Sequence, residues 1–309
     1  MDNEQTTKLH FEVGPRSNKQ KLGEFLFDNI NGLSKMYLRE LIKTGKCEVN
    51  GEHENSGYRL RSNDFVEVEA DLSRGTAMQP QEIPFDIVFE DDHLIVVNKP
   101  AGMLVHPTHR DKTGTLLNAL TFHLNREVLA QHEIAKKSAF STPHYAFIRP
   151  GLVHRLDKQT SGLMVVVKTA AAHRRLSADF MKKRIEKRYL ALVEGVLGDD
   201  LGTIVAPIGR FADLKHWSIK TDGKHSESRY WVRKRFSDRT LLELEPVTGR
   251  TNQLRIHCEM IGHPIIGDVR RGSREFGRIC LHAFQLSFPH PDHGERMKFE
   301  SDPPDGFSI

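Results

Sequence analysis

The chain has 309 residues, of which 38% are hydrophobic and 28% charged, and a formal net charge of +4. This length suits a small module joined to a larger body, and the composition is that of a globular protein with an apolar core. No stretch approaches the roughly 20 apolar residues that cross a bilayer, and the opening residues lack a signal-peptide pattern. We therefore expect neither a membrane protein nor an exported one.

The cysteines and the charge distribution indicate the cellular compartment and the kind of partner. Cys47, Cys258 and Cys280 show no disulfide or zinc spacing, so a cytoplasmic protein is expected. Seven Lys and Arg but only two acids lie between residues 173 and 188, and eight against three lie between 215 and 239. A solvated face would explain one basic stretch. Several such stretches favour a polyanion as partner, because phosphates neutralise clustered cations.

The N-terminal part predicts a small module of helix and short strands. Ser34 suits a helix N-cap, apolar residues recur at helical spacing up to Ile42, and Gly45 ends the helix. Short strands are expected around residues 47–49 and 64–70. The segment 77–84 contains prolines and few apolar residues, as linkers do. We expect an N-terminal extension over 1–15, a module over 16–76, a linker over 77–84 and a catalytic domain over 85–309.

The larger part predicts a sheet with a few helices. Apolar runs and periodicity indicate strands and helices alternating along the chain. The strands are expected at 87–90, 94–99, 162–168, 188–195 and 240–246, and the helices at 116–124, 172–180 and 254–261. The pattern predicts an α+β fold, with a mostly antiparallel or mixed central sheet and helices on its outer faces.

The segment GLVHRLDKQTSGL, residues 151–163, is the most informative. Asp157 lies between an apolar lead-in and a turn of small residues that leads into a buried strand. Its carboxylate is therefore expected at the mouth of a strand, which suits a nucleophile or a base. The plainer alternative is an aspartate that only caps the turn.

This segment resembles the HRLDxxTSG signature of the RluA family of RNA pseudouridine synthases, through His154, Arg155, Leu156, Asp157, Thr160, Ser161 and Gly162. Three further segments resemble motifs of that family in the same order: NKPAGMLVHP (98–107), KRYLALVEG (187–195) and GRTNQLRIH (249–257). The resemblance covers about residues 85–290. It implies the pseudouridine synthase fold, isomerisation of uridine in structured RNA, and neither cofactor nor metal.

The resemblance also implies a catalytic set of Asp157, Tyr189 and Arg255. Asp157 would act on the ribose, by covalent attack or by stabilising the opened sugar. Arg255 would keep that carboxylate charged and aimed through two parallel donors, and Tyr189 would stack on the flipped uracil and help to remove a proton late in the reaction. The alternatives are a surface cation for Arg255 and a core residue for Tyr189.

Five further residues are expected at the substrate site. By the same resemblance, Arg155 takes the place of the extruded base and Leu254 forms an apolar wall under the uracil. His154, Thr160 and Lys99 belong to the matching motifs. His154, together with His257 and His263, lacks zinc-ligand spacing, so core or hydrogen-bonding histidines are the better interpretation.

The N-terminal module resembles, less strongly, an S4-like RNA-binding module. Lys35, Arg39, Lys43 and Lys46 place positive charge on and just after its helix, although a solvated helix face would look the same. The expected partner is RNA, first large-subunit ribosomal RNA and second transfer RNA. Neither DNA nor a membrane is expected, and we expect a monomer.

The sequence departs from the family pattern at two places, and two other functions remain open. Asn252 stands where many members have His, and Val269-Arg270-Arg271-Gly272 replaces a more usual aromatic-glycine pair. A non-catalytic RNA-binding protein that kept the fold is the main alternative, and the presence of Asp157, Tyr189 and Arg255 together speaks against it. A hydrolase would need a second acid or a metal cluster beside Asp157, and none is visible nearby in the sequence.

Overall fold

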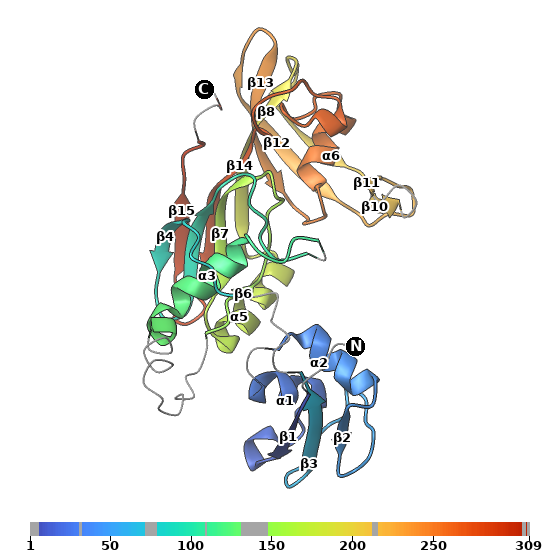
Figure 1. Cartoon of the computed structure of the whole chain (residues 1–309). Helices are drawn as coiled ribbons and strands as arrows, with labels where there is room; N and C mark the ends of the chain where they lie inside the picture. Colours follow the sequence, from blue (N-terminus) through green and yellow to red (C-terminus); the bar gives the residue numbers. More distant parts are fainter. Residues whose placement is uncertain are drawn as a thin grey trace. The chain divides into compact units, whose positions relative to one another are not determined.

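The computed structural model describes residues 6–30, 33–71, 79–108, 110–130, 148–211, 216–304 and 307. They form two compact units, a smaller one up to Gln79 and a larger one from Pro80 onward (Figure 1). This division falls within the expected linker, 77–84. Residues 72–78, which precede it, lie outside the described part of the chain.

The smaller unit has a three-stranded antiparallel sheet in the order β1-β3-β2 with two helices. Its elements are β1 (Thr7–Glu12), the 3-10 helix η1 (Pro15–Ser17), α1 (Leu22–Asn29), α2 (Lys35–Lys43), β2 (Cys47–Val49) and β3 (Phe65–Ala70). The Ser34 hydroxyl caps α2 by accepting from the Tyr37 amide at 3.1 Å. Residues 7–12, which were expected in an extension over 1–15, belong instead to the sheet of the smaller unit. There β1 pairs along β3, with Leu9 opposite Val68.

The larger unit is built on one broad sheet. The strands of this unit are β4 (Asp86–Glu90), β5 (Leu94–Lys99), β6 (Gly151–Leu152), β7 (Ser161–Val167), β8 (Glu186–Glu194), β9 (Leu201–Val205), β10 (Ile208–Phe211), β11 (His216–Ile219), β12 (Glu227–Arg235), β13 (Arg239–Pro246), β14 (Leu281–Pro289) and β15 (Arg296–Glu300). The helices of this unit include α3 (Leu116–Leu124), α5 (Ala170–Met181), α6 (Gln253–Met260) and the 3-10 helix η2 (Val269–Arg271).

The sheet is mixed. Its order is β4-β5-β7-β14-β8-β13-β12-β9, with β15 beside β14 and β6 beside β7, while β10 and β11 form a separate hairpin. Strands β7 and β14 pair in parallel, and the other pairs are antiparallel. The expected α+β fold with a mixed central sheet is confirmed.

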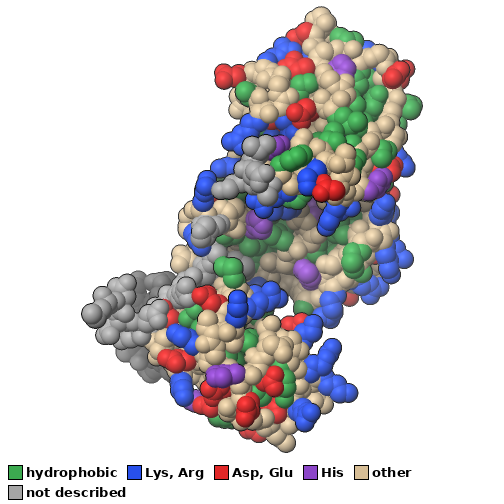
Figure 2. All heavy atoms as spheres, turned by 90° about the vertical axis from the view of Figure 1, so that its right-hand side faces the viewer, with side chains coloured by type: hydrophobic (Ala, Val, Ile, Leu, Met, Phe, Trp, Pro, Cys, Tyr) green, Lys and Arg blue, Asp and Glu red, His purple; other side chains and the backbone are tan. Residues whose placement is uncertain are grey.

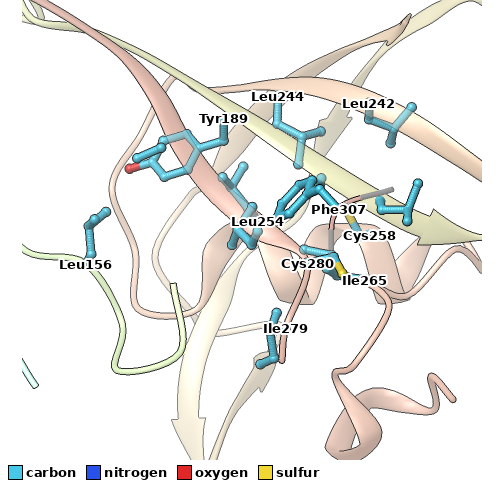
Figure 3. Packing of buried hydrophobic residues seen from close by; sticks show 14 of the residues in the cluster. Leu156, Tyr189, Leu242, Leu244, Leu254, Cys258, Ile265, Ile279, Cys280 and Phe307 are labelled. Carbon is cyan, nitrogen blue, oxygen red and sulfur yellow. The ribbon is translucent and has the colours of Figure 1, made fainter. Parts of the chain in front are cut away.

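Both faces of the central strands are covered, which explains their continuous apolar sequence. Along β5, Ile95 and Val97 belong to one hydrophobic cluster, whereas Leu94 and Val96 belong to another. Helices α3 and α6 contribute to the first cluster and α5 to the second. Figure 3 shows part of the first cluster, where Leu254 and Cys258 of α6 lie with side chains of the sheet.

One glycine decides how the sheet closes beside the Asp157 turn. Gly162, the second residue of β7, has φ +116, and a Cβ there would lie 2.4 Å from the Ala283 carbonyl oxygen on β14. Any other residue would push the two parallel strands apart. Gly162 therefore lets β7 pair with β14 from its first residue, Ser161, only four residues after Asp157.

Candidate active site

A cavity of about 310 Å³ in the larger unit brings together residues from three of the four motif segments. Its lining includes Asp157, Tyr189, Leu254, Arg255, Arg155, His154 and Thr160, all expected at the site from the sequence. Lys99, also expected there, does not belong to the lining. The cavity therefore joins the turn before β7, strand β8 and the start of α6, which are far apart in the sequence.

Asp157 presents its carboxylate to the cavity. Its backbone carbonyl, not its side chain, closes the turn by accepting from the Thr160 amide at 3.1 Å. The side chain is 26% exposed, and Oδ2 lies 3.8 Å from Nη1 of Arg255. Thr160 is itself buried at the cavity wall. The backbone of the turn thus fixes the position of Asp157, and its carboxylate remains open to a ligand.

Arg255 makes its bidentate pair with Asp268, a residue that sequence reasoning missed. Nε and Nη2 donate to the two Asp268 oxygens at 2.6 and 2.8 Å. The expected two-donor pairing with Asp157 is therefore wrong, since only Nη1 faces Asp157. Burial alone would lower the pKa of Arg255, but the hydrogen bonds and charge of Asp268 and the charge of Asp157 raise it. The guanidinium stays charged between two carboxylates.

Backbone geometry fixes Arg255 and Asp268. Asn252, the N-cap of α6, has φ 57, a left-handed conformation that Asn tolerates well, and its Oδ1 accepts from Arg255 Nη1 at 3.1 Å. A Cβ on Gly267, at φ +85, would lie 1.9 Å from the Arg278 carbonyl oxygen, so only glycine fits before Asp268. Asn252, one of the two departures from the family pattern, thus helps to hold Arg255.

The other departure also has a structural role. Arg271 donates from Nη2 to the Trp217 carbonyl oxygen of the β10–β11 hairpin at 3.0 Å. Its Nη1 pairs with Glu259 of α6, and its Nε lies 3.7 Å from Asp268. Arg271 therefore ties the hairpin and α6 to the carboxylate that holds Arg255.

Tyr189 and Leu254 form the apolar side of the cavity, one from β8 and one from α6 (Figure 3). They are 8% and 7% exposed. Burial, and then the charge of Asp157, raise the pKa of the Tyr189 phenol well above its usual range. The phenol is therefore protonated at neutral pH and offers the cavity a ring face and a hydroxyl.

Lys187 also lines the cavity and was not singled out from the sequence. It lies two residues before Tyr189 on β8, so strand alternation puts both on the same face, and this alternation was the available signal. Burial lowers the pKa of Lys187, and its Nζ lies 5.7 Å from the centre of the Phe180 ring.

His154 has a structural contact at the cavity edge. Its Nε2 accepts from the Val165 amide of β7 at 3.0 Å, and its ring stacks on Phe180 with centroids 5.0 Å apart. Burial, with a smaller effect of Lys187, lowers the pKa of His154 to about 3. The ring is therefore neutral, which agrees with the hydrogen-bonding interpretation.

Lys99 is fully buried and lies behind the Asp157 turn. Its Nζ donates to the carbonyls of Pro100, Met103 and Lys158 at 2.7, 2.9 and 3.2 Å. Burial lowers the pKa of Lys99 to about 8, Asp157 opposing this effect and Arg278 adding to it. The geometry favours a residue that positions the neighbour of Asp157 over one that contacts substrate.

Arg155 lies at the cavity, and the histidines other than His154, namely His257 and His263, make hydrogen-bonding contacts. Arg155 is exposed, and its Nη1 lies 3.2 Å from His106 Nε2 in the 98–107 segment. The buried His257 ring bridges the hydroxyls of Ser226 and Ser228, both at 2.9 Å, and His263 Nδ1 lies 2.6 Å from the Glu194 carbonyl oxygen. Among the described residues, no group of three or more potential ligands could hold a metal.

Basic side chains are exposed on both units. On the face of the larger unit in Figure 2, Lys and Arg side chains gather around a hollowed region. In the smaller unit, Lys35, Arg39, Lys43 and Lys46 are all exposed on or just after α2. In the part of the chain that the structure covers, no helix is long and apolar enough to cross a membrane.

Known proteins resemble this chain over most of its length. The model of the RNA pseudouridylate synthase family matches residues 93–260. An uncharacterised RNA pseudouridine synthase of Bacillus subtilis is 36% identical, over 96% of this chain and 95% of that protein. A ribosomal large subunit pseudouridine synthase D of Zymomonas mobilis is 35% identical, over 100% and 96%. The solved structure of human RNA pseudouridylate synthase domain containing 1 has a TM-score of 0.53 at 26% identity, covering 74% of this chain and 87% of that one.

Proposed function

Because the chain belongs to the RNA pseudouridylate synthase family, and is thus an isomerase that converts uridine to pseudouridine in RNA, we propose that its substrate is large-subunit ribosomal RNA. Full-length relatives that are named for the ribosomal large subunit support this choice over transfer RNA. The basic face of the larger unit and the exposed cations of the smaller one suit a large folded RNA.

The reaction asks little of the protein beyond one well-placed carboxylate. The bond between uracil N1 and ribose C1′ breaks, the base turns, and a bond forms between C5 and C1′. The proton on C5 leaves and N1 gains one, so nothing is oxidised or reduced. The observation that carries the proposed mechanism is the Asp157 carboxylate, which is open to the cavity and 3.8 Å from the Arg255 guanidinium. A charged carboxylate serves attack at C1′ and stabilisation of a positive ribose alike.

The walls of the cavity suit an extruded uracil. A base taken out of a helix loses stacking worth a few kcal/mol and must regain it in the pocket. The Tyr189 ring and the Leu254 side chain provide this apolar surface. Arg155, exposed at the edge, takes the place that the base leaves, since a planar guanidinium both stacks and donates hydrogen bonds.

The smaller unit acts as an S4-like RNA-binding module in this proposal. Its support is the row of exposed cations on α2, of which Arg39 and Lys43 are one helical turn apart. Replacing both by Gln should weaken binding of large-subunit RNA. The slope of log K against log salt concentration should also become shallower, by roughly 0.7 to 0.9 for each lost phosphate contact. The matched control is Lys8→Gln on β1, because Lys8 lies 4.0 Å from Glu67. Unchanged RNA binding and salt dependence would contradict a role of the smaller unit in binding RNA.

Mapping pseudouridines tests the choice of substrate. Ribosomal and transfer RNA from cells that lack the protein would be compared with RNA from cells that carry the wild type or Asp157→Asn. We expect at least one large-subunit uridine to be modified only with the wild type. A site lost from transfer RNA alone would move the substrate to that class. Unchanged maps in both RNAs would contradict the proposed function.

A further inference from the structure

A second cavity of about 680 Å³ adjoins the one that holds Asp157, Tyr189 and Leu254. The two share five lining residues: Arg155, Asp157, Thr251, Asn252 and Arg255. The remaining walls of the second cavity come from residues 158–159, 267–270 and 276–279 and from Leu104. Asp157 therefore lies on the boundary between two open spaces, and the reaction at C1′ needs only the first.

The lining of the second cavity favours an anion. Its basic members are Arg155, Lys158, Arg255, Arg270 and Arg278, and its acids are Asp157 and Asp268. Asp268 is only 2% exposed and already bears the bidentate pair from Arg255. Arg270 and Lys158 are exposed at the cavity. Positive charge thus exceeds negative charge in a space next to the reacting carboxylate, as a polyanion requires.

An aromatic side chain stands in the same cavity. Phe276 is 42% exposed, although a large apolar ring gains by burial. Exposed aromatic rings among cations are how proteins bind single-stranded nucleic acid, because every base has a face that can stack. The combination of Phe276 with Arg270 and Lys158 therefore matches a nucleotide, with one surface for its base and two cations for its phosphate.

We propose that the second cavity is a subsite for the nucleotide directly next to the reacting uridine in the RNA strand. This inference rests on the proposed function. Consecutive nucleotides are joined by a single phosphodiester, and the two cavities share the wall that carries Asp157. A strand whose uridine fills the first cavity therefore places a neighbour in the second. That neighbour stacks its base on Phe276, and its phosphate faces Arg270 and Lys158.

A double-mutant cycle between protein and RNA tests the stacking. The probe is a stem-loop cut from large-subunit RNA around a uridine that the wild type modifies, with either flanking nucleotide replaced by an abasic ribose. On the intact stem-loop, Phe276→Ala should lower affinity about five- to hundred-fold, and Phe276→Tyr should restore it. On one of the two abasic RNAs, Phe276→Ala should cause no further loss. Met260→Ala, which removes another exposed side chain, is the control.

The outcomes separate the subsite from the function. If Phe276→Ala weakens all three RNAs equally, or none of them, the subsite is wrong while the wild type still makes pseudouridine. If the wild type modifies no uridine in any RNA, the proposed function itself fails.

The phosphate contact has its own test. One linkage beside the uridine is replaced by an uncharged methylphosphonate. Arg270→Gln should weaken binding of the normal RNA but not of this one, and Arg270→Lys should keep most of the affinity because a point charge suffices for a phosphate. Equal losses on both RNAs would show that Arg270 does not face the phosphate next to the uridine.

Discussion

Asp268 Oδ1 and Oδ2 accept hydrogen bonds from Nη2 and Nε of Arg255 at 2.8 and 2.6 Å, whereas Asp157 Oδ2 lies 3.8 Å from the third guanidinium nitrogen, Nη1. Arg255 is thus held by the buried Asp268 and presents its third nitrogen to Asp157. An arginine held in this way has a fixed direction before substrate binds, which is what electrostatic preorganisation requires. The orientation of Asp157 therefore depends on a residue that lines only the neighbouring cavity.

Arg255→Lys should damage the reaction although it keeps the charge. An ammonium cannot pair with both Asp268 oxygens and still face Asp157 and Asn252. Losing one charge-assisted hydrogen bond, worth roughly 1.5 to 3 kcal/mol, lowers the rate about ten- to hundred-fold. Single-turnover kinetics with excess enzyme would measure this, and RNA affinity should change little. Arg296→Lys, in a surface pair with Glu186, is the matched control. Weaker binding with unchanged chemistry would make Arg255 a phosphate contact.

Asp268→Asn should resemble Arg255→Lys, because Asp268 acts through Arg255. If so, the double variant is no slower than the slower single variant, whereas independent roles would multiply the two losses.

Several central strands and the site motifs could be predicted from the sequence, but β14, which lies between β7 and β8, was not. Apolar runs indicated β5 and β7, helical spacing indicated α3, and the signature segment placed Asp157 just before β7. These signals are local. The link between Arg255 and Asp268 is not, because Asp268 lies in a loop and only the turn at Gly267 brings it to α6. Strand β1 was missed because a single short edge strand has little pattern of its own.

The Lys99 ammonium should make activity depend on pH. It has three protons for three carbonyl oxygens, and above a pKa of about 8 it loses one of these donors. The single-turnover rate of the wild type should therefore fall as pH rises through about 8. Lys99→Met should be slower at pH 7 and lack this fall, whereas Lys168→Met, which removes a lysine paired with Glu90, should retain it. A fall that persists in Lys99→Met would assign it to another group.

Two buried histidines should make the fold sensitive to acid. Burial lowers the pKa values of His257 and His282 to about 4, whereas an unfolded histidine titrates near 6.5. Between these values the unfolded chain binds the proton first, so stability falls as pH drops from about 6.5, by up to about 1.4 kcal/mol per pH unit for each histidine. Urea unfolding at pH 7 and 5 would measure it. His257→Gln should reduce the dependence and the exposed His225→Gln should not. If stability depends on pH equally in both variants, His257 does not contribute to the acid sensitivity.

Gly162→Ala should destabilise the larger unit. The new Cβ would sit 2.4 Å from the Ala283 carbonyl oxygen at a φ of +116. Backbone strain and overpacking each cost roughly 1 to 3 kcal/mol. Gly198→Ala is the control, because no atom lies within 4 Å of its added Cβ. Thermal unfolding should show a clear drop for Gly162→Ala alone, and equal melting temperatures would mean that β7 and β14 can separate without cost.

Single turnover of Asp157→Asn, with enzyme in excess over an RNA that the wild type modifies, is the most direct measurement. The substitution keeps the shape of the side chain and removes its charge. Affinity should come from many phosphate contacts and chemistry from this one carboxylate. We expect RNA binding close to that of the wild type and no detectable pseudouridine, with full activity in the control Asp92→Asn, an exposed acid on the β4–β5 turn. Near-normal turnover by Asp157→Asn would contradict the account.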